Sequence, residues 1–296
     1  MAGPNGRRSL AARLKDKRII VAPGVYDAVS ARIADRMGFE ALYMTGYGTV
    51  ASHLGLADAG LATYSEMVGR VAIIAENTTT PLIADADTGY GGLLNVRRTV
   101  QGYEAAGAAG IQIEDQEMPK KCGHTPGRRV VAIEEMVQKI QVAADARRHD
   151  DTVIIARTDA RTTLGIDEAL RRGEAYAKAG ADVLFIESPE TTEELAMIGR
   201  SFDVPVLCNV VNTGRTPELP SKQLEELGFG IAIYPGMALK AASQAVTAAY
   251  SYLHDTGATL GINVPLMDSK DLHELMGFPD VWEFEKRWHT GTGAAE

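Results

Sequence analysis

The chain has 296 residues, with 30 Lys and Arg against 39 Asp and Glu, which gives a net charge of −9. That acidic surplus argues against a nucleic-acid partner, because binding to a phosphate backbone needs clustered Lys and Arg. No apolar run approaches the roughly 20 residues of a membrane span. The two cysteines, Cys122 and Cys208, are too few for a disulfide framework, so a reducing compartment, the cytoplasm, is expected. The Arg- and Lys-rich N-terminus leaves a mitochondrial or other organellar location as the alternative.

Eight short, β-branched apolar runs alternate with amphipathic segments along the chain. The predicted strands are 19–23, 41–45, 81–85, 110–114, 152–157, 183–187, 205–210 and 230–234. A short helix over 9–17 precedes them, with Ser9 as its N-cap. The other predicted helices are 27–37, 64–76, 95–106, 133–148, 167–179, 191–200, 221–227 and 237–253. Eight strand–helix units in series predict an α/β fold, a (β/α)8 barrel of the TIM type.

Two further helical stretches, 268–276 and 280–288, follow the eighth strand–helix unit. We therefore assign residues 1–254 to a catalytic barrel domain that includes the short N-terminal helix. Residues 255–296 are assigned to a C-terminal helical extension, which covers an end of the barrel or a neighbouring subunit.

Polar side chains follow the predicted strands at their carboxyl ends, where a barrel of this kind carries its chemistry. Residues two apart in a strand share a face, so Asp85 with Asp87, and Arg157 with Asp159, can project together. Asp85, Asp87 and Glu114, with no histidine on the same strand ends, predict a hard cation such as Mg²⁺. Arg157 would then be the counter-charge for an anionic ligand. An ion-pair network that only fixes the strands is the alternative.

The second chemical feature is the long loop after the fourth strand, which contains Lys120, Lys121, Cys122, Gly123 and His124. At roughly 14 residues it exceeds the usual length of a βα loop, as lids and binding loops do. The neighbouring lysines and histidine favour the thiolate of Cys122, so this cysteine can act as an acid, a base or a nucleophile. A small buried hydrophobe is the alternative, and it is the expectation for Cys208, which lies inside an apolar strand.

Together these residues resemble the isocitrate lyase / phosphoenolpyruvate mutase superfamily over nearly the whole chain. The motifs that carry the resemblance are Tyr43-Met44-Thr45-Gly46, Asp58, Asp85-Ala86-Asp87-Thr88-Gly89-Tyr90-Gly91, Ile113-Glu114-Asp115-Gln116, Lys120-Lys121-Cys122-Gly123-His124, Arg157-Thr158-Asp159-Ala160 and Glu187. The Lys-Lys-Cys-Gly-His motif is the specific one. It is similar to the lyase branch, whereas the phosphonate-forming mutases and related hydrolases lack this cysteine. The chain is similar in length to 2-methylisocitrate lyases, 2,3-dimethylmalate lyases, petal death proteins and oxaloacetate acetylhydrolases.

The resemblance implies a barrel with an exchanged C-terminal helix, assembled as a homotetramer built from dimers. It also implies a Mg²⁺ site, with Mn²⁺ as a substitute, at Asp85 and Asp87, with Glu114 contributing directly or through water. The substrate-binding residues that it implies are Thr45, Gly46 and Tyr47, through backbone N–H groups, together with Lys121, Gly123, Arg157, Glu187 and Asn209.

The reaction expected from the resemblance is a retro-aldol (Claisen-type) cleavage of a 2-hydroxy di- or tricarboxylate. The products are a 2-oxo acid, pyruvate, and a second carboxylate. Tyr43 or Asp58 would assist loss of the hydroxyl proton, and Cys122 would protonate the leaving carbanion. His124 would tune the Cys122 proton or bind a substrate carboxylate. The expected ligand is therefore a small anionic 2-hydroxy or 2-oxo carboxylate.

Two other functions remain open at this point. The nearer one is hydrolysis of oxaloacetate to oxalate and acetate on the same scaffold. The more distant one is a non-catalytic binding protein that has kept the barrel. The substituents at C2 and C3 of the substrate are not predicted, because they depend on loop side chains that the sequence does not place.

Overall fold

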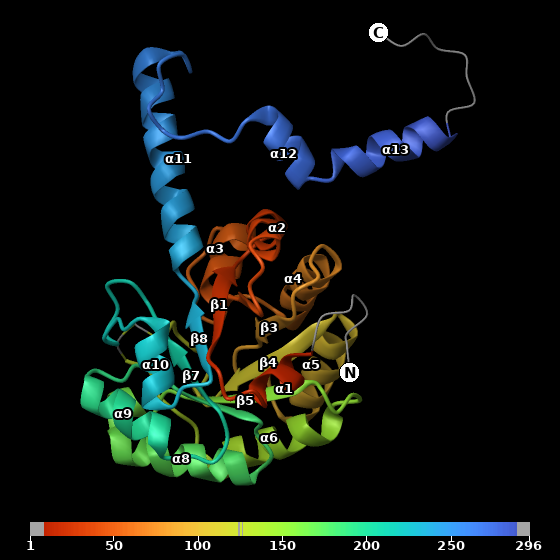
Figure 1. Cartoon of the computed structure of the whole chain (residues 1–296). Coiled ribbons are helices and arrows are strands. Elements are labelled where there is room, and N and C mark those ends of the chain that lie inside the picture. The colour runs from red at the N-terminus through yellow and green to blue at the C-terminus, as the bar shows by residue number, and fades with distance from the viewer. Residues whose placement is uncertain (1–8, 124, 126, 289–296) are drawn as a thin grey trace. The chain divides into compact units, whose positions relative to one another are not determined.

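The computed structural model describes residues 9–123, 125 and 127–288, and its central feature is a closed barrel of eight parallel strands (Figure 1). Each strand pairs with its neighbours in chain order, and β8 closes the barrel by pairing with β1. The strands are β1 (Ile20–Val25), β2 (Leu42–Met44), β3 (Leu82–Asp85), β4 (Ala108–Glu114), β5 (Val153–Thr158), β6 (Val183–Ile186), β7 (Val206–Asn209) and β8 (Ile231–Tyr234). The predicted (β/α)8 barrel is confirmed.

The structure has helices before the first strand, between successive strands and after the last strand (Figure 1). They are α1 (Leu10–Leu14), α2 (Ala28–Arg36), α3 (Gly46–Leu54), α4 (Tyr64–Glu76), α5 (Leu93–Ala105), α6 (Ile133–Ala146), α7 (Arg161–Leu164), α8 (Ile166–Lys178), α9 (Thr192–Arg200), α10 (Ser221–Leu227), α11 (Met237–Thr256), α12 (Ser269–Leu275) and α13 (Phe278–Trp288). The predicted helices are all present, and α4 and α10 begin and end at the predicted residues.

Helices α3 and α7 were not predicted. Two of the first three residues of α3 are glycines, Gly46 and Gly48, which disfavour a helix intrinsically. The helix forms there because Thr45 caps it: the Thr45 hydroxyl accepts a hydrogen bond from the Gly48 N–H at 3.4 Å. Helix α7 is a single turn of four residues, too short to show a periodic pattern.

Alternate residues of each strand point into the barrel and form its inner layer. Ile155, Val183 and Phe185 belong to this buried inner cluster, while Ile154 and Leu184 pack in the outer cluster beneath the helices. The same alternation continues beyond the last apolar layer. It places the polar side chains found at the carboxyl ends of the strands on the inward face, in the barrel mouth.

The opposite end of the barrel is covered by α1. Ser9 caps this helix as predicted, since its hydroxyl accepts a hydrogen bond from the Ala12 N–H at 3.3 Å. Leu10 is fully buried in the inner cluster and packs beside Gly110, near the start of β4. The amino end of the barrel is therefore filled with apolar side chains, which leaves the carboxyl end for the site.

The chain divides into two compact units, residues 1–241 and residues 242–296, with the division inside α11. The sequence had placed the boundary at 254, near the end of the same helix. In the second unit α12 and α13 contact each other, and α13 has no buried residue. Within the described residues, no helix combines the length and apolar character required to cross a bilayer.

Candidate active site

Tyr43, Asp85 and Gln112 form a hydrogen-bonded group at the ends of the neighbouring strands β2, β3 and β4. The Tyr43 hydroxyl donates to Gln112 Oε1 at 2.9 Å and lies 3.5 Å from Asp85 Oδ2. Gln112 Nε2 donates to Asp85 Oδ1 at 3.2 Å. Burial, together with the negative charge of Asp85, raises the pKa of Tyr43 well above its usual range. The phenol therefore keeps its proton and serves as a hydrogen-bond donor.

Asp85 and Asp87 lie close together because the backbone turns sharply between them. Asp87 has a φ of 48°, in the left-handed region that non-glycine residues rarely adopt, and its N–H donates to Asp85 Oδ1 at 3.0 Å. The Asp85 carboxylate also abuts the start of α3, where a Cβ on Gly46 would lie 2.6 Å from Asp85 Oδ2. Position 46 therefore needs glycine. Backbone strain of this kind is typical of functional sites.

Lys120 is the buried cation beside these carboxylates, although it comes from the loop after β4. Its Nζ lies 2.6 Å from Asp87 Oδ1 and also forms an ion pair with Asp58. Burial raises the pKa of Asp87 to about 6; the charge of Lys120 opposes the rise, and the charges of Asp85 and Asp58 add to it. The structure thus brings together three sequence-predicted residues: Asp58 and Asp87 pair with one ammonium group, and Asp85 lies against Asp87.

Arg157 is the centre of a second charged group, on β5. Its Nε and Nη2 donate to the two carboxylate oxygens of Asp159, each at 2.9 Å. Nε also lies 3.4 Å from Glu114 Oε2, and Nη2 lies 3.6 Å from Glu187 Oε2, which accepts a hydrogen bond from Asn209 Nδ2 at 3.2 Å. Burial raises the pKa of Glu114 well above its usual range, although the charge of Arg157 opposes the rise. Among the described residues, these contacts leave Nη1 of Arg157 unused.

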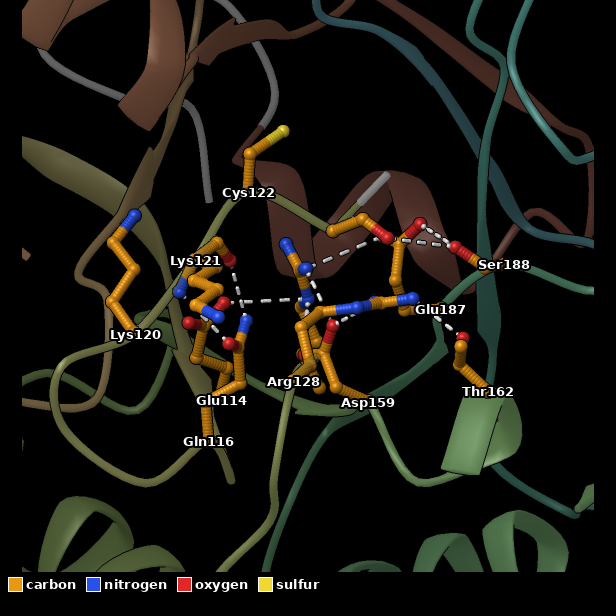
Figure 2. Close-up of polar contacts among 12 residues, drawn as sticks. Glu114, Gln116, Lys120, Lys121, Cys122, Arg128, Asp159, Thr162, Glu187 and Ser188 are labelled. Atoms are coloured by element: carbon orange, nitrogen blue, oxygen red, sulfur yellow. Dashed lines mark hydrogen bonds and ion pairs between the residues drawn. The ribbon is translucent and has the colours of Figure 1, made fainter. Parts of the chain in front are cut away.

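The loop that carries Cys122 (residues 115–132, the cysteine loop) lies directly over this second group (Figure 2). A Cβ on Gly123 would lie 2.5 Å from Arg157 Nη2 and 2.8 Å from Glu187 Cδ, so glycine is what permits the approach. The Ser188 hydroxyl donates to the Gly123 carbonyl at 3.0 Å and fixes the loop there. The backbone next to Cys122 is thus seated on the mouth of the barrel.

The other candidates in the cysteine loop lie in different surroundings. Gln116 brackets the loop: its Nε2 donates to the Lys121 carbonyl at 2.8 Å, and its Oε1 accepts from the Lys121 N–H at 3.0 Å. The Lys121 side chain is exposed, and its Nζ donates to the Gly127 carbonyl at 3.4 Å. Cys122 is half-buried, and its sulfur points away from the charged side chains drawn in Figure 2. His124 lies outside the described residues.

The backbone of residues 45–47, predicted to bind a carboxylate, lies where β2 passes into α3. The Thr45 N–H donates to the Val25 carbonyl at 3.1 Å, so this group is already used. Gly46 and Tyr47 are the first two residues of α3, and the N–H groups at such positions have no partner within the helix. A helix start of this kind favours an anion. Gly46 lies against Asp85, whereas the side chain of Tyr47 is half exposed.

Two residues that contact the site were not singled out from the sequence, Arg128 and Ser188. Ser188 directly follows Glu187 and has a φ of 59°. Its hydroxyl shares its one proton between the Gly123 carbonyl and Glu187 Oε1, which lies 2.9 Å away. Its place after a strand-end carboxylate was the available signal. Arg128 is buried and pairs with Asp159. No sequence signal marks it, since a loop has no periodicity that shows which side chain turns inward.

The barrel mouth buries more negative than positive charge. Its charged side chains, each less than a tenth exposed, are Asp58, Asp85, Asp87, Glu114, Asp159, Glu187, Lys120, Arg128 and Arg157. Among the described residues, the carboxylates of this group exceed the cations by three formal charges. Glu114 Oε1 is buried without a hydrogen-bond partner in the described part of the chain. No set of three or more His, Cys, Asp or Glu side chains there is arranged to hold a metal ion as it stands. The oxygen-only donors fit a hard divalent cation, which needs only one or two protein carboxylates.

The chain is similar in sequence and in fold to several named enzymes. The family model for phosphoenolpyruvate phosphomutase matches residues 10–254. The chain is 50% identical over 278 residues to 2,3-dimethylmalate lyase of Eubacterium barkeri, which covers 94% of this chain and 96% of that protein. It is 41% identical over 274 residues to 2-methylisocitrate lyase of Aeropyrum pernix, covering 93% and 87% of the two chains.

Solved structures with the same fold include hydrolases as well. Oxaloacetate acetylhydrolase in complex with 3,3-difluorooxalacetate superimposes with a TM-score of 0.91 at 36% identity, covering 96% of this chain and 97% of that chain. Phosphonopyruvate hydrolase in complex with oxalate and Mg²⁺ superimposes with a TM-score of 0.86 at 33% identity, covering 95% and 98%.

Proposed function

The chain belongs to the phosphoenolpyruvate phosphomutase family, and we propose that it is a carbon–carbon lyase acting on a small anionic 2-hydroxy di- or tricarboxylate. The proposed substrates are of the 2,3-dimethylmalate or 2-methylisocitrate type, cleaved to pyruvate and a second carboxylate. The observation that carries the proposal is the cysteine loop seated on Arg157 and Glu187 through Gly123. It places a loop with a thiol over a guanidinium that can bind a carboxylate. The identity to 2,3-dimethylmalate lyase supports 2,3-dimethylmalate as the first substrate to test.

Asp85, Asp87 and Glu114 would hold Mg²⁺, for which Mn²⁺ could substitute. The buried surplus of negative charge and the unpaired Glu114 Oε1 support this assignment, as does the likeness to a hydrolase whose complex contains Mg²⁺. When bound, the metal ion supplies Lewis acidity that stabilises negative charge on the hydroxyl and carboxylate oxygens of the substrate. Lys120 balances the remaining carboxylate charge through its ion pairs with Asp87 and Asp58.

Substrate carboxylates are bound by the guanidinium of Arg157 and by the start of α3. Arg157 offers Nη1, because its Nε and Nη2 are held by Asp159. Thr45 fixes the first turn of α3, so the N–H groups of Gly46 and Tyr47 can hold a second carboxylate. The other residues assigned to binding are Glu187, which follows β6, Asn209 of β7, and Lys121 and Gly123 of the cysteine loop. His124 is assigned to tuning the Cys122 proton or to binding a substrate carboxylate.

The proposed proton transfers use three residues, Asp58, Tyr43 and Cys122. Asp58 accepts the proton of the substrate hydroxyl, while Tyr43, which keeps its own proton, donates a hydrogen bond to the developing oxyanion. The bond between the carbinol carbon and its neighbour breaks, and its electron pair passes to the leaving carboxylate as an enediolate. Cys122 then gives its thiol proton to that carbanion and is reprotonated from solvent.

The acid role of Cys122 is tested by removing each thiol in turn. In Cys122→Ser we expect pyruvate release to fall at least about 100-fold, as for loss of a general acid, with Mg²⁺ and substrate binding retained. Cys208→Ala is the control, because this other cysteine is buried in β7 away from the loop; its turnover should stay near that of the wild type. Near-normal turnover in Cys122→Ser would refute the assignment.

Oxaloacetate hydrolysis is the second candidate function, favoured by the close superposition with oxaloacetate acetylhydrolase. A single panel with Mg²⁺ separates the two reactions. Pyruvate release from 2,3-dimethylmalate or 2-methylisocitrate supports the lyase, whereas oxalate release from oxaloacetate supports the hydrolase. A flat result over 2-hydroxy and 2-oxo acids would overturn both and leave a non-catalytic binding barrel.

Homotetrameric assembly, as a dimer of dimers, is also proposed. The second unit leaves large apolar side chains exposed on α13, namely Val281, Trp282, Phe284 and Trp288. An exposed apolar surface of this kind is typical of an association surface, and a second copy of this chain is the proposed partner. Light scattering should therefore give four times the chain mass of 31.7 kDa. A monomeric mass would contradict the proposal.

A further inference from the structure

Arg128 stands near the end of the cysteine loop, yet its side chain is fully buried at the barrel mouth (Figure 2). Its Nη1 forms an ion pair with Asp159 Oδ1, and its Nη2 donates to the hydroxyl of Thr162 in α7. Arg129, its neighbour in the chain, is largely exposed and pairs with Glu117 instead. Burying a guanidinium is costly unless it is paired, so the inward turn of Arg128 indicates a specific use.

Asp159 is the residue that Arg128 shares with Arg157. Its Oδ1 accepts from both guanidinium groups, and its Oδ2 accepts from Arg157 Nε. Its backbone N–H donates to Asp115 Oδ1 at 2.9 Å, and the Thr158 hydroxyl donates to Asp115 Oδ2 at 2.7 Å. Asp115 therefore fixes the backbone at Asp159, and the two arginines meet at one oxygen atom of the Asp159 carboxylate.

The charge balance at Asp159 affects what Arg157 can do. A carboxylate held by Arg157 alone would direct its whole charge at that guanidinium. With Arg128 on the same oxygen, part of the negative charge of Asp159 is offset by a second cation. More of the positive charge of Arg157 then remains available to attract an anionic ligand, which can bind at its Nη1.

Arg128 also fixes one side of the cysteine loop. The Gln116 amide brackets Lys121 on one side of Cys122, and Ser188 holds the Gly123 carbonyl beside it. Arg128 adds a buried side-chain anchor between Gly123 and α6. The backbone of the loop's return is held separately, by the Glu117 N–H on the Arg129 carbonyl and the Val131 N–H on the Asp115 carbonyl, each at 2.9 Å. Without Arg128, the loop would lose its side-chain contacts with Asp159, which directly follows β5, and with Thr162 of α7.

We propose that Arg128 is a positioning residue that acts through Asp159, setting the anion-binding state of Arg157 and anchoring the cysteine loop above it. This inference rests on the proposed function, in which Arg157 binds a substrate carboxylate and Cys122 delivers a proton. It assigns to one buried side chain the connection between those two parts of the site.

The test compares Arg128→Met with Arg129→Met, which removes the same charge one residue away on the surface. In Arg128→Met we expect KM to rise at least about tenfold, the change that a lost charge-assisted contact brings. We also expect kcat to fall about 100-fold, because Cys122 is displaced. Iodoacetamide should alkylate Cys122 at least several-fold faster than in the wild type. Arg129→Met should stay within twofold on all three measurements.

Two further variants keep the test decisive. Arg128→Lys retains the charge but cannot reach both Asp159 and Thr162, so it should restore KM more than kcat. Thr162→Val removes only the hydroxyl contact and should accelerate alkylation mildly, which gives a readout if Arg128→Met does not fold. Wild-type alkylation rates in both Thr162→Val and folded Arg128→Met would overturn the inference. Because alkylation needs no turnover, it still tests the anchor if no substrate of the panel reacts.

Discussion

Gly123→Ala is the sharpest single test of the site, because the structure gives the size of the clash. An alanine Cβ at this position would lie 2.5 Å from Arg157 Nη2, 2.8 Å from Glu187 Cδ and 3.0 Å from Glu187 Cγ. Ordinary contacts of a Cβ lie at 3.4–4 Å. The loop and the strand ends must therefore separate by about 1 Å, a displacement that can cost on the order of 100-fold in rate.

The loop will move rather than the strand ends. Arg157 is held by both oxygens of Asp159, and Glu187 is held by Ser188 and Asn209, whereas Cys122 beside the clash is only half-buried. We therefore expect kcat/KM for pyruvate release to fall roughly 100-fold. The free energy of unfolding should change by no more than about 1 kcal/mol, because no core side chain is altered.

Gly69→Ala is the matched control, since nothing lies within 4 Å of a Cβ at that position in α4. It should leave turnover unchanged and raise stability by up to about 1 kcal/mol, the usual gain of alanine over glycine in a helix. Steady-state assays and urea unfolding of both variants decide the matter. Wild-type turnover in Gly123→Ala, or a loss of turnover matched by a large loss of stability, would refute the reasoning.

Three other predictions concern the metal site, the thiols and the network behind the mouth. Burial raises the pKa of Asp87 to about 6, so a proton competes with Mg²⁺ for this carboxylate at low pH. Mg²⁺ affinity measured by calorimetry should be constant above about pH 7 and fall about tenfold per pH unit below about pH 6. An affinity that does not change with pH would contradict this prediction. Iodoacetamide should modify Cys122 and spare Cys208 in the native protein, because burial raises the pKa of Cys208 to about 12. Equal labelling of the two cysteines in peptide maps would contradict the buried position of Cys208. Asp115→Ala should lower the free energy of unfolding in urea by about 3–5 kcal/mol. It removes one of the two carboxylates paired with Arg172, the other being Glu168, and it leaves the buried hydroxyls of Thr158 and Tyr176 without this acceptor. A loss below about 1 kcal/mol would count against that role.

The strand ends were predictable because alternation in a strand is strict. Once 152–157 was recognised as a strand with Ile155 inward, Arg157 had to be inward as well, and the same rule places Asp85 and Glu114. The closed barrel followed from counting eight strand–helix units. Both predictions use regular geometry that the sequence carries directly.

The loop geometry was not predictable in the same way. Lys120 and Lys121 are adjacent and chemically alike, yet Lys120 enters the carboxylate group and Lys121 is exposed. Arg128 and Arg129 differ in the same way: the side chain of Arg128 is buried and that of Arg129 is exposed. Which member turns inward depends on tertiary partners, Asp87 and Asp159, that come from other strands. No periodic pattern in the local sequence indicates which of two adjacent side chains turns inward.

The acidic character of the whole chain and the charges at the barrel mouth together bear on how an anionic substrate is bound. A net charge of −9 repels an anionic substrate at long range, and the buried carboxylates of the mouth repel it at short range. Lys120 and Arg157 are both engaged by carboxylates, so neither offers its full charge. A divalent cation would offset two of the three surplus charges there. The carboxylate-rich mouth is therefore better understood as a site built for a cation and an anionic ligand together than as a site for the anion alone.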